Sequence, residues 1–444
     1  MIVSKELKKL SELFPVDLYI VGGATRDFLL GYKLSDFDLS SSLTGEQVME
    51  LLKGTEFKVT PHSLKLGTLG IKVGKQVMEY TAFRTDSYGE KGVHSPVEVH
   101  FNVGIEQDAF RRDFTINAIY YNIKEDKFLD FTGGLEDLKN RVLKTTREPE
   151  SVFEEDALRV LRLVRIASKL GLEIEQETLC QAKKNAYLLK EIAVERIRDE
   201  FEKILVSDIE NGIEDAQIRG IQLLVEIGAM EYIMPELLES VGVKQPPKHH
   251  LYDVYNHILQ TVRIAPSHLR LAALLHDIGK PRSIDEEGRM TEHPYVGAQM
   301  AKEIMLRLRY PLREIDKVSR LVETHMYDLR CLMSDGTLRV FVLKNQDILS
   351  DLIELKMADH TAHGLKDGVS PSALNLARVF REMRERKVAF SLKELPITGE
   401  TLIDLKVKPR DRAKALSSLL EHGAYIGKQL TKEECITFIK ERIN

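Results

Sequence analysis

The sequence has few cysteines and no long apolar run. Its three cysteines, Cys180, Cys331 and Cys435, are far apart and odd in number, which excludes a disulfide framework and a cysteine-based zinc knuckle. No stretch of about 18 apolar residues occurs, and the N-terminal segment has the pattern of a short amphipathic helix without the apolar region of a signal peptide. These absences predict a soluble cytoplasmic protein that makes no contact with a membrane.

An excess of positive charge is also missing. The 64 basic and 69 acidic residues leave a formal net charge of −5, so any contact with nucleic acid has to come from local basic patches. The chain has no internal repeat and no low-complexity tract. At 444 residues, with roughly 100–200 residues per domain, it is expected to form about three domains rather than one compact fold.

The order of secondary-structure signals divides the chain. Short β-rich runs alternate with turns in the first part, which indicates an α/β or α+β fold. After Lys144 the strand signals stop, and from Phe153 apolar residues recur at three- and four-residue steps, which predicts a helix that Gly171 ends. The predicted strands are residues 18–21, 69–73, 77–83, 97–101, 118–123 and 128–131.

Two segments have the composition of linkers. Residues 241–250 contain two adjacent prolines, and a second break lies at residues 364–371. We therefore predict a head over residues 1–145, a helical neck over 146–243, a histidine-rich helical domain over 244–366 and a helical tail over 367–444.

A glycine pair and two aspartates form the first chemical pattern. A buried strand ends at Gly22 and Gly23, and a helix follows at once, so its free N–H groups can meet a phosphate. Asp36 and Asp38 are two apart in a predicted strand and so share one face. Because neighbouring carboxylates repel each other unless a cation lies between them, the pair predicts a Mg²⁺ site that activates a hydroxyl and neutralises a triphosphate. The alternative is a solvated acidic pair behind an ordinary glycine turn.

Five segments resemble the motifs of the class II tRNA nucleotidyltransferases and the bacterial poly(A) polymerases, within the polymerase-β-like superfamily. The resemblance implies template-independent addition of C, C and A to the 3′ end of tRNA, from CTP and ATP, with release of pyrophosphate. The five segments occur in order at residues 22–38, 111–118, 130–145, 155–159 and 195–200.

The same resemblance implies roles for single residues. Asp36 and Asp38 would be the catalytic residues and would bind Mg²⁺. Glu79 is a candidate third acidic group near the metals, with a solvated strand residue as the alternative. Asp156 and Arg159 are three apart on the predicted helix, where an acceptor-only carboxylate and a donor-only guanidinium can match the edge of a base; a surface salt bridge is the alternative. The implied nucleotide-binding residues are Gly22, Gly23, Arg26, Arg111, Arg112, Asp113, Asn117, Asp156 and Arg159.

One segment departs from the family pattern. Residues 84–101 resemble the loop that helps to switch specificity from C to A. Relatives often carry an acidic residue and then basic residues directly before a proline there, whereas this chain has Glu90 to Ser95. Two alternatives follow from this departure: the enzyme adds only C, or the loop works with different side chains.

A second set of residues has the chemistry of metal ligands. The adjacent His276 and Asp277 interrupt a strongly apolar helix, where burying an unpaired ion is costly. The arrangement resembles the HD superfamily of metal-dependent phosphohydrolases, although Met326 stands where many relatives have an aspartate. The implied ligands of a divalent transition metal or Mg²⁺ are His257, His276, Asp277 and Asp359, with His293 and His325 for a second metal. An inactive HD fold kept as a spacer is the alternative.

The tail concentrates cations that would follow an RNA backbone, with a solvated helix start as the alternative. These candidates are Lys406, Lys408, Arg410, Arg412 and the nearby Lys414.

The predicted fold class is therefore a multidomain chain with an α/β polymerase-β-like nucleotidyltransferase head, followed by an all-α neck, an HD domain and a tail. Its expected partners are tRNA, CTP and ATP, with no obligate protein partner. A poly(A) polymerase shares the chemistry, and an HD phosphohydrolase with a non-catalytic RNA-binding head is the alternative of another class.

Overall fold

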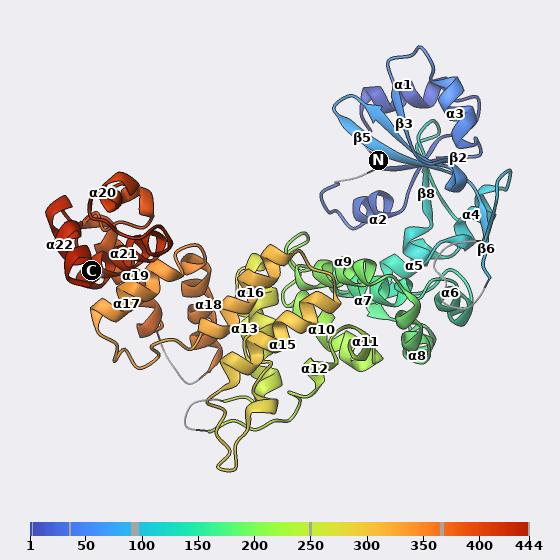
Figure 1. Cartoon of the computed structure of the whole chain (residues 1–444). Helices are drawn as coiled ribbons and strands as arrows, with labels where there is room; N and C mark the ends of the chain where they lie inside the picture. Colours follow the sequence, from blue (N-terminus) through green and yellow to red (C-terminus); the bar gives the residue numbers. More distant parts are fainter. Residues whose placement is uncertain (2, 35–36, 90–96, 248–250, 365–367, 443–444) are drawn as a thin grey trace. The chain divides into compact units, whose positions relative to one another are not determined.

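A computed structural model describes the chain except residues 2, 35–36, 90–96, 248–250, 365–367 and 443–444. It contains two compact units, Met1–Pro235 and Glu236–Asn444 (Figure 1). Within the described ranges, the search for a helix with the length and hydropathy of a membrane span finds none. The four predicted domains are a finer division than these two units and stay a prediction.

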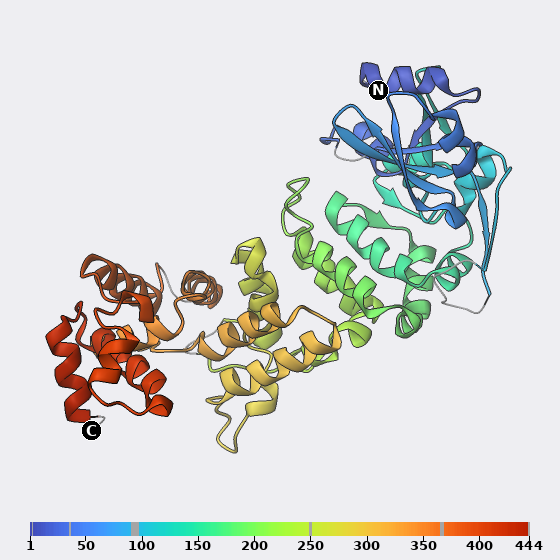
Figure 2. The ribbon, with the colours of Figure 1, turned by 45° about the horizontal axis from the view of Figure 1, so that its top comes forward.

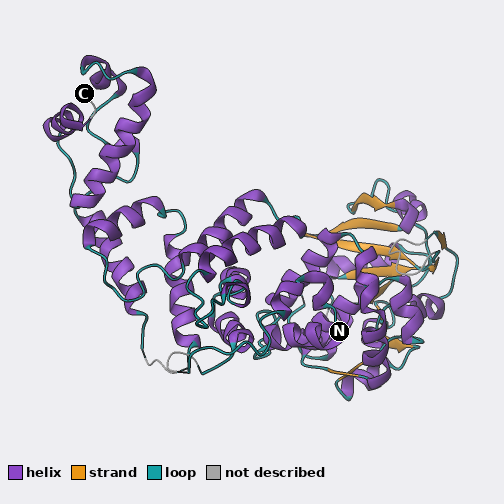
Figure 3. Cartoon of the chain, turned by 60° about the horizontal axis from the view of Figure 1, so that its bottom comes forward, coloured by secondary structure: helices purple, strands orange, loops and turns teal. Residues whose placement is uncertain are grey.

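A mixed seven-stranded sheet forms the centre of the first unit. The strands lie in the order β3-β4-β5-β2-β1-β8-β9, and β2 and β5 are parallel whereas the other described neighbours are antiparallel. Figure 3 shows the strands gathered in this unit. Their bounds are β1 (Tyr19–Val21), β2 (Asp38–Ser41), β3 (Lys58–Ser63), β4 (Thr68–Val73), β5 (Gln76–Ala82), β8 (Ile119–Asn122) and β9 (Lys127–Asp130). Two short pairs lie outside it, β6 (Thr85–Ser87) with β7 (Glu98–His100) and β10 (Val142–Leu143) with β11 (Glu173–Ile174).

The two faces of this sheet differ in chemistry. One face is covered by α1 and α3, from which Leu7 and Val48 pack into the same core as Leu39 and Tyr80 of the strands (Figures 1 and 2). Side chains alternate along a strand, so the exposed Asp38 lies on the opposite face. The helices of this part are α1 (Lys5–Leu13), α2 (Gly23–Leu29), α3 (Gly45–Leu51), α4 (Ile105–Arg111) and α5 (Gly134–Lys139).

All six predicted strands are present, but β3, β6, β10 and β11 were missed, and β11 lies beyond Lys144, where the strand signals were expected to stop. The strand β3 is an exposed edge strand of polar residues with Pro61 inside it and an irregular register at that point. Proline cannot donate to a ladder and is confined to strand edges and bulges, so the sequence pattern of β3 lacks an apolar signal.

The neck differs from the prediction at one position. The expected single helix from Phe153 to Gly171 is broken at Asp156, whose backbone is extended (φ −148°, ψ 99°). The Asp156 carboxylate accepts the backbone N–H of Leu158 at 3.0 Å, and this local cap outweighs the helical pattern. The helices are α6 (Pro149–Glu155), α7 (Leu158–Leu170), α8 (Gln176–Asn185), α9 (Val194–Leu205), α10 (Ala216–Ile227), α11 (Met230–Ile233) and α12 (Pro235–Leu238).

The described part of the second unit is helical. The helices α13, α15 and α18 and the C-terminal ends of α14 and α16 supply the residues of the histidine cluster, and α19 to α22 follow them. The bounds are α13 (Val254–Ile264), α14 (Arg270–Leu275), α15 (His293–Arg307), α16 (Leu312–Thr324), α17 (Asp335–Lys344), α18 (Leu349–Ala362), α19 (Pro371–Glu385), α20 (Gly399–Asp404), α21 (Arg412–Ile426) and α22 (Lys432–Arg442).

Candidate functional site

The glycine turn lies directly against one of the two predicted catalytic carboxylates. Gly22 precedes α2 with φ +83°, a conformation that favours glycine. A Cβ atom there would lie 3.1 Å from Asp38 Oδ2, so the turn also requires a residue without a side chain. Gly23 opens α2. Asp36 lies outside the described residues.

Asp38 has an acidic neighbour on the next strand. Its Cα is paired in register with that of Glu79 on the parallel strand β5, and both residues are exposed while Leu39, Met78 and Tyr80 beside them are buried. Paired residues of adjacent strands point to the same face. Glu79 is thus placed beside Asp38, as expected for a third acidic group.

A line of polar contacts joins the glycine turn to the neck. Arg26 is buried and donates to Asn117 Oδ1 at 2.7 Å, besides its ion pair with Asp27. Asn117 donates to Asp113 Oδ1 at 3.1 Å, and Asp113 Oδ2 accepts from Arg162 of α7 at 2.5 Å. The predicted residues Arg26, Asp113 and Asn117 therefore lie in one network.

The two predicted arginines of α4 and the segment after it are held by a buried carboxylate. Asp108 accepts from Arg111 at 2.8 Å, from Arg112 at 3.1 Å and from the Tyr120 hydroxyl. Burial alone would raise the pKa of Asp108, but the charges of Arg111 and Arg112 lower it to about 2. Both guanidinium groups are thus fixed before any ligand arrives.

Replacing Asp108 by asparagine should destabilise the head by about 3–5 kcal/mol, because two buried guanidinium groups lose their shared counter-charge. Hydrogen exchange of peptides covering residues 105–122 measures the effect.

The stabilisation by Asp108 depends on pH. The folded pKa of about 2 lies below the ordinary value near 3.9, so this stabilisation is present above about pH 4 and is lost as pH falls toward about 2. The variant should lack that pH dependence. Glu50→Gln, which removes an exposed pair with Lys53, is the control and should change exchange little; equal exchange in both variants would contradict the assignment.

A cleft of the first unit gathers five of the nine predicted nucleotide-binding residues, Arg111, Arg112, Asp113, Asp156 and Arg159. Its volume is about 670 Å³. Seven cations and three carboxylates line it, which is the balance expected for a polyanionic ligand. The charged lining residues are Lys65, Arg84, Arg111, Arg112, Arg159, Arg162 and Arg196 with Asp86, Asp113 and Asp156.

The predicted base-reading pair lines this cleft, but not as neighbours on one helix. Asp156 lies in the break before α7, 3.8 Å from Arg196 of α9. Arg159 is buried, and its guanidinium donates to Glu155 Oε2 at 3.1 Å and to the Val152 carbonyl at 3.1 Å. The helical spacing argument was therefore wrong, and a turn brings both groups to the same cleft.

Four predicted ligand atoms of the second unit meet at one point. His257 Nε2 lies 3.0 Å from Asp359 Oδ1 and 3.3 Å from both His276 Nε2 and Asp277 Oδ2. All four side chains are buried. His257, His276 and Asp359 form a group able to hold a metal ion.

The remaining predicted ligands form a second group around the same aspartate. Asp277 Oδ1 lies 3.2 Å from His293 Nε2 and 3.7 Å from His325 Nε2. Among the described residues, Asp277 Oδ1 accepts no hydrogen bond, Asp277 Oδ2 has Lys280 Nζ at 2.6 Å, and the Nε2 atoms of His293 and His325 have no hydrogen-bond partner. Buried polar atoms without partners are costly, so this donor set fits cations.

The imidazoles are oriented by their own backbone. Nδ1 of His276, His293 and His325 each donates to the carbonyl three residues earlier, at 2.5–2.7 Å. This hydrogen bond fixes the tautomer and directs Nε2 inward, as in metal sites. Burial lowers the pKa of His325 to about 4, which keeps this ring in the neutral form that binds a metal.

Sequence reasoning missed several partners of these groups. Glu155 contacts Arg159, and Arg162 contacts Asp113. Gln245 holds Lys280, which lies 2.6 Å from Asp277 Oδ2; nothing in the sequence pairs a linker glutamine with this lysine.

Four of the tail cations are exposed, namely Lys406, Lys408, Arg410 and Lys414. Arg412 is half-buried and donates to the Val407 carbonyl at 3.1 Å.

Three segments match known protein families. Residues 18–144 match the Poly A polymerase head domain, residues 171–240 match the probable RNA and SrmB-binding site of polymerase A, and residues 248–363 match the HD domain.

Similar proteins cover the whole chain. It is 32% identical to the CC-adding tRNA nucleotidyltransferase of Thermus thermophilus, over 96% of this chain and 93% of that protein. It is 37% identical to the CCA-adding enzyme of Bacillus cytotoxicus, over 47% of this chain and 50% of that protein. The crystal structure of the Bacillus stearothermophilus CCA-adding enzyme in complex with CTP superposes with a TM-score of 0.68 at 24% identity, covering 99% of this chain and 97% of that one. The last comparison shows a shared fold.

Proposed function

The chain belongs to the family of poly(A) polymerases and tRNA nucleotidyltransferases, and from this premise we propose that it adds C, C and A to the 3′ end of tRNA. It is a nucleotidyltransferase that takes CTP and ATP and releases pyrophosphate. The observation that carries the proposal is the cleft in which six further cations adjoin Asp156 and Arg159, because it offers a triphosphate site and a base-reading site together.

The residues of the head and neck would have different tasks, and the glycine turn, Asp38 and Glu79 are not among the described residues that line the cleft. The glycine turn brings free N–H groups of α2 to a phosphate, and the arginines supply charge. Asp36 and Asp38 would hold Mg²⁺, with Glu79 beside Asp38. Mg²⁺ bound there would neutralise the triphosphate and favour an ionised 3′ hydroxyl. Phosphoryl transfer needs mainly alignment and charge neutralisation, so no covalent intermediate with the protein is expected.

The deciding experiment gives the protein a tRNA that lacks its 3′ end, with CTP alone, ATP alone and both. We expect two C residues from CTP alone and a complete CCA end from both. Products that stop after CC would assign to this chain the CC-adding activity that the name of the Thermus relative gives. A run of A would assign a poly(A) polymerase, and no product with any nucleotide would favour the non-catalytic RNA-binding head.

Replacing Arg159 by alanine should relax the choice of nucleotide. Hydrogen bonds to a charged group are worth about 1.5–3 kcal/mol, or roughly 10- to 100-fold in discrimination. Steady-state kinetics with CTP, ATP, GTP and UTP measures the ratio. Arg165→Ala is the matched control, because Arg165 of the same helix also holds an ion pair, with Glu200, but lies outside the cleft. If the Arg159 variant still excludes GTP and UTP as well as the control does, Arg159 has a structural role and does not read the base.

We also propose that the HD domain is a metal-dependent phosphohydrolase that acts on phosphorylated RNA ends or small phosphoesters, and so restores an end that the head can extend. The support is the convergence of all six predicted ligands on two adjoining groups. A divalent ion there would act as a Lewis acid on a phosphoryl group. Lys280, held between Asp277 and Gln245, is placed to meet a phosphate.

The exposed tail cations support RNA binding through phosphates, with tRNA read largely by shape. A tRNA substrate would place the protein in the cytoplasm.

A further inference from the structure

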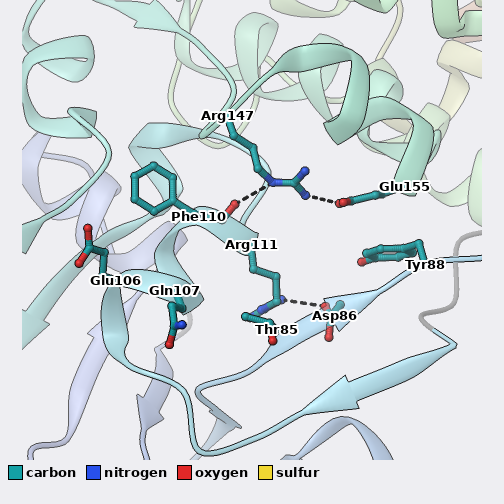
Figure 4. Close-up of a pocket in the computed structure, with 9 residues that line it drawn as sticks. All are labelled: Thr85, Asp86, Tyr88, Glu106, Gln107, Phe110, Arg111, Arg147 and Glu155. Carbon is teal, nitrogen blue, oxygen red and sulfur yellow. Dashed lines mark hydrogen bonds and ion pairs between the residues drawn. The ribbon is translucent and has the colours of Figure 1, made fainter.

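A second pocket adjoins the nucleotide cleft on the head (Figure 4). It has a volume of about 400 Å³, within the range of roughly 300–1,000 Å³ that small ligands occupy. Three residues, Asp86, Tyr88 and Arg111, line both cavities. A group in this pocket therefore lies next to the incoming nucleotide. The other lining residues are Thr85, Glu106, Gln107, Phe110, Arg147 and Glu155.

The charge of this pocket differs from that of the cleft. Three carboxylates face two guanidinium groups, and both guanidinium groups are already paired. Arg147 is paired with Glu155 and donates to the Phe110 carbonyl, whereas Arg111 is paired with Asp108 and Asp86. Without an excess of positive charge the pocket disfavours a phosphate. The pocket is therefore better suited to the base of a nucleotide, which is uncharged.

Aromatic rings supply the surface that such a group needs. Phe110 and Tyr88 stand on different sides of the pocket in the view of Figure 4, and the Phe110 side chain is 36% exposed. The Phe110 backbone is tied to the neck, since its carbonyl accepts from Thr146 and Arg147. An exposed ring on a fixed backbone is a stacking surface for a base.

A buried carboxylate oxygen defines which base fits. The Asp86 side chain is 2% exposed. Its Oδ1 lies 3.0 Å from Arg84 Nε but accepts no hydrogen bond from the described residues. A carboxylate only accepts, so it prefers the amino group of cytosine or adenine to the carbonyl of uracil.

We propose that this pocket receives the base of the nucleotide at the 3′ end of the acceptor RNA, with Phe110 as its stacking surface and Asp86 as the acceptor for an amino group. The inference rests on the proposed nucleotide addition. It assigns the cleft to the incoming nucleotide and the adjoining pocket to the end that is extended.

The test uses the full chain and two RNAs, a tRNA transcript that ends in cytidine and the same RNA with an abasic terminal residue. Phe110→Ala should raise the KM for the cytidine-ended RNA about tenfold, the effect of one lost base–aromatic stack, at an unchanged KM for CTP. The abasic RNA should show the same rise with the wild-type protein and no further rise with the variant. Phe110→Tyr should restore binding, and Leu135→Ala, a residue of similar exposure outside both pockets, should behave as wild type.

Other results would overturn the proposal. If Phe110→Ala and the abasic RNA act additively, the ring and the terminal base do not meet. If the variant raises the KM for CTP instead, the pocket belongs to the incoming nucleotide. Asp86→Asn should narrow the preference for a terminal cytidine over uridine, because an amide also donates; an unchanged preference would remove Asp86 from the site. A wild-type protein that adds no nucleotide would instead reject the proposed function.

Discussion

Replacing Asp38 by asparagine is expected to reduce CTP addition by about 10³-fold or more, because the metal-held charge at the reacting phosphate is worth several kcal/mol. The side chain keeps its shape, and Asp38 is exposed at the start of β2 rather than part of the core. Folding and RNA affinity should therefore persist. Single-turnover addition and RNA binding, measured on the same preparation, separate the two properties.

A matched control for Asp38→Asn is Asp126→Asn, which changes an exposed aspartate of the head far along the chain from the glycine turn. The control should retain addition. If the Asp38 variant kept more than a few per cent of wild-type turnover, Asp38 would not be a metal ligand. If it lost RNA binding as well, the aspartate would have a structural role that its exposure does not indicate.

The second large effect concerns the HD domain. The double change His276→Ala and Asp277→Ala removes ligands from both groups, since Asp277 adjoins each. Release of phosphate from 3′-phosphorylated nucleotides, or opening of a 2′,3′-cyclic phosphate, should depend on added Mg²⁺, Mn²⁺, Ni²⁺ or Co²⁺ in the wild type. It should fall by about 10³-fold in the variant. CTP addition should persist, because the head residues belong to the other compact unit.

The chain offers a close control for this double variant. His268 and Asp351 form an exposed histidine–aspartate pair at 3.3 Å in the same unit, and replacing both by alanine should leave hydrolysis unchanged. A wild-type protein that is silent with every metal and every phosphorylated end, yet active in addition, would identify the HD domain as a spacer. Loss of CTP addition in the HD variant would show that the two sites depend on each other.

The elements that sequence predicted well are those whose pattern reflects burial. Strands such as β5 and β8 carry apolar residues that are buried in the sheet, so their composition predicts that they are strands. The strand β3 does not, because an exposed edge places no demand for apolar side chains and accepts Pro61. The break at Asp156 was missed for a different reason: one side-chain cap separates α6 from α7, although the helical periodicity runs from Phe153 into α7.

The candidate sites divide in the same way. The residue types of the HD ligands identify a metal site even before their distances are known, because histidine and aspartate are costly to bury without a cation. The partners that orient a site are harder to predict. Glu155 meets Arg147 through a turn, and Asp86 meets Arg111 across two elements, so both contacts depend on tertiary placement that no local spacing encodes.

The division of the chain into two compact units has a consequence for how the two sites evolve. The described residues of the nucleotide cleft all belong to Met1–Pro235, and those of the two ligand groups all belong to Glu236–Asn444. Selection can therefore act on either site alone, since a substitution that removes a residue of one site lies in a different compact unit from the other site. Lineages with a reduced need for end repair could lose the six ligands one after another while keeping a complete head, and the order of such losses would record which activity the organism required.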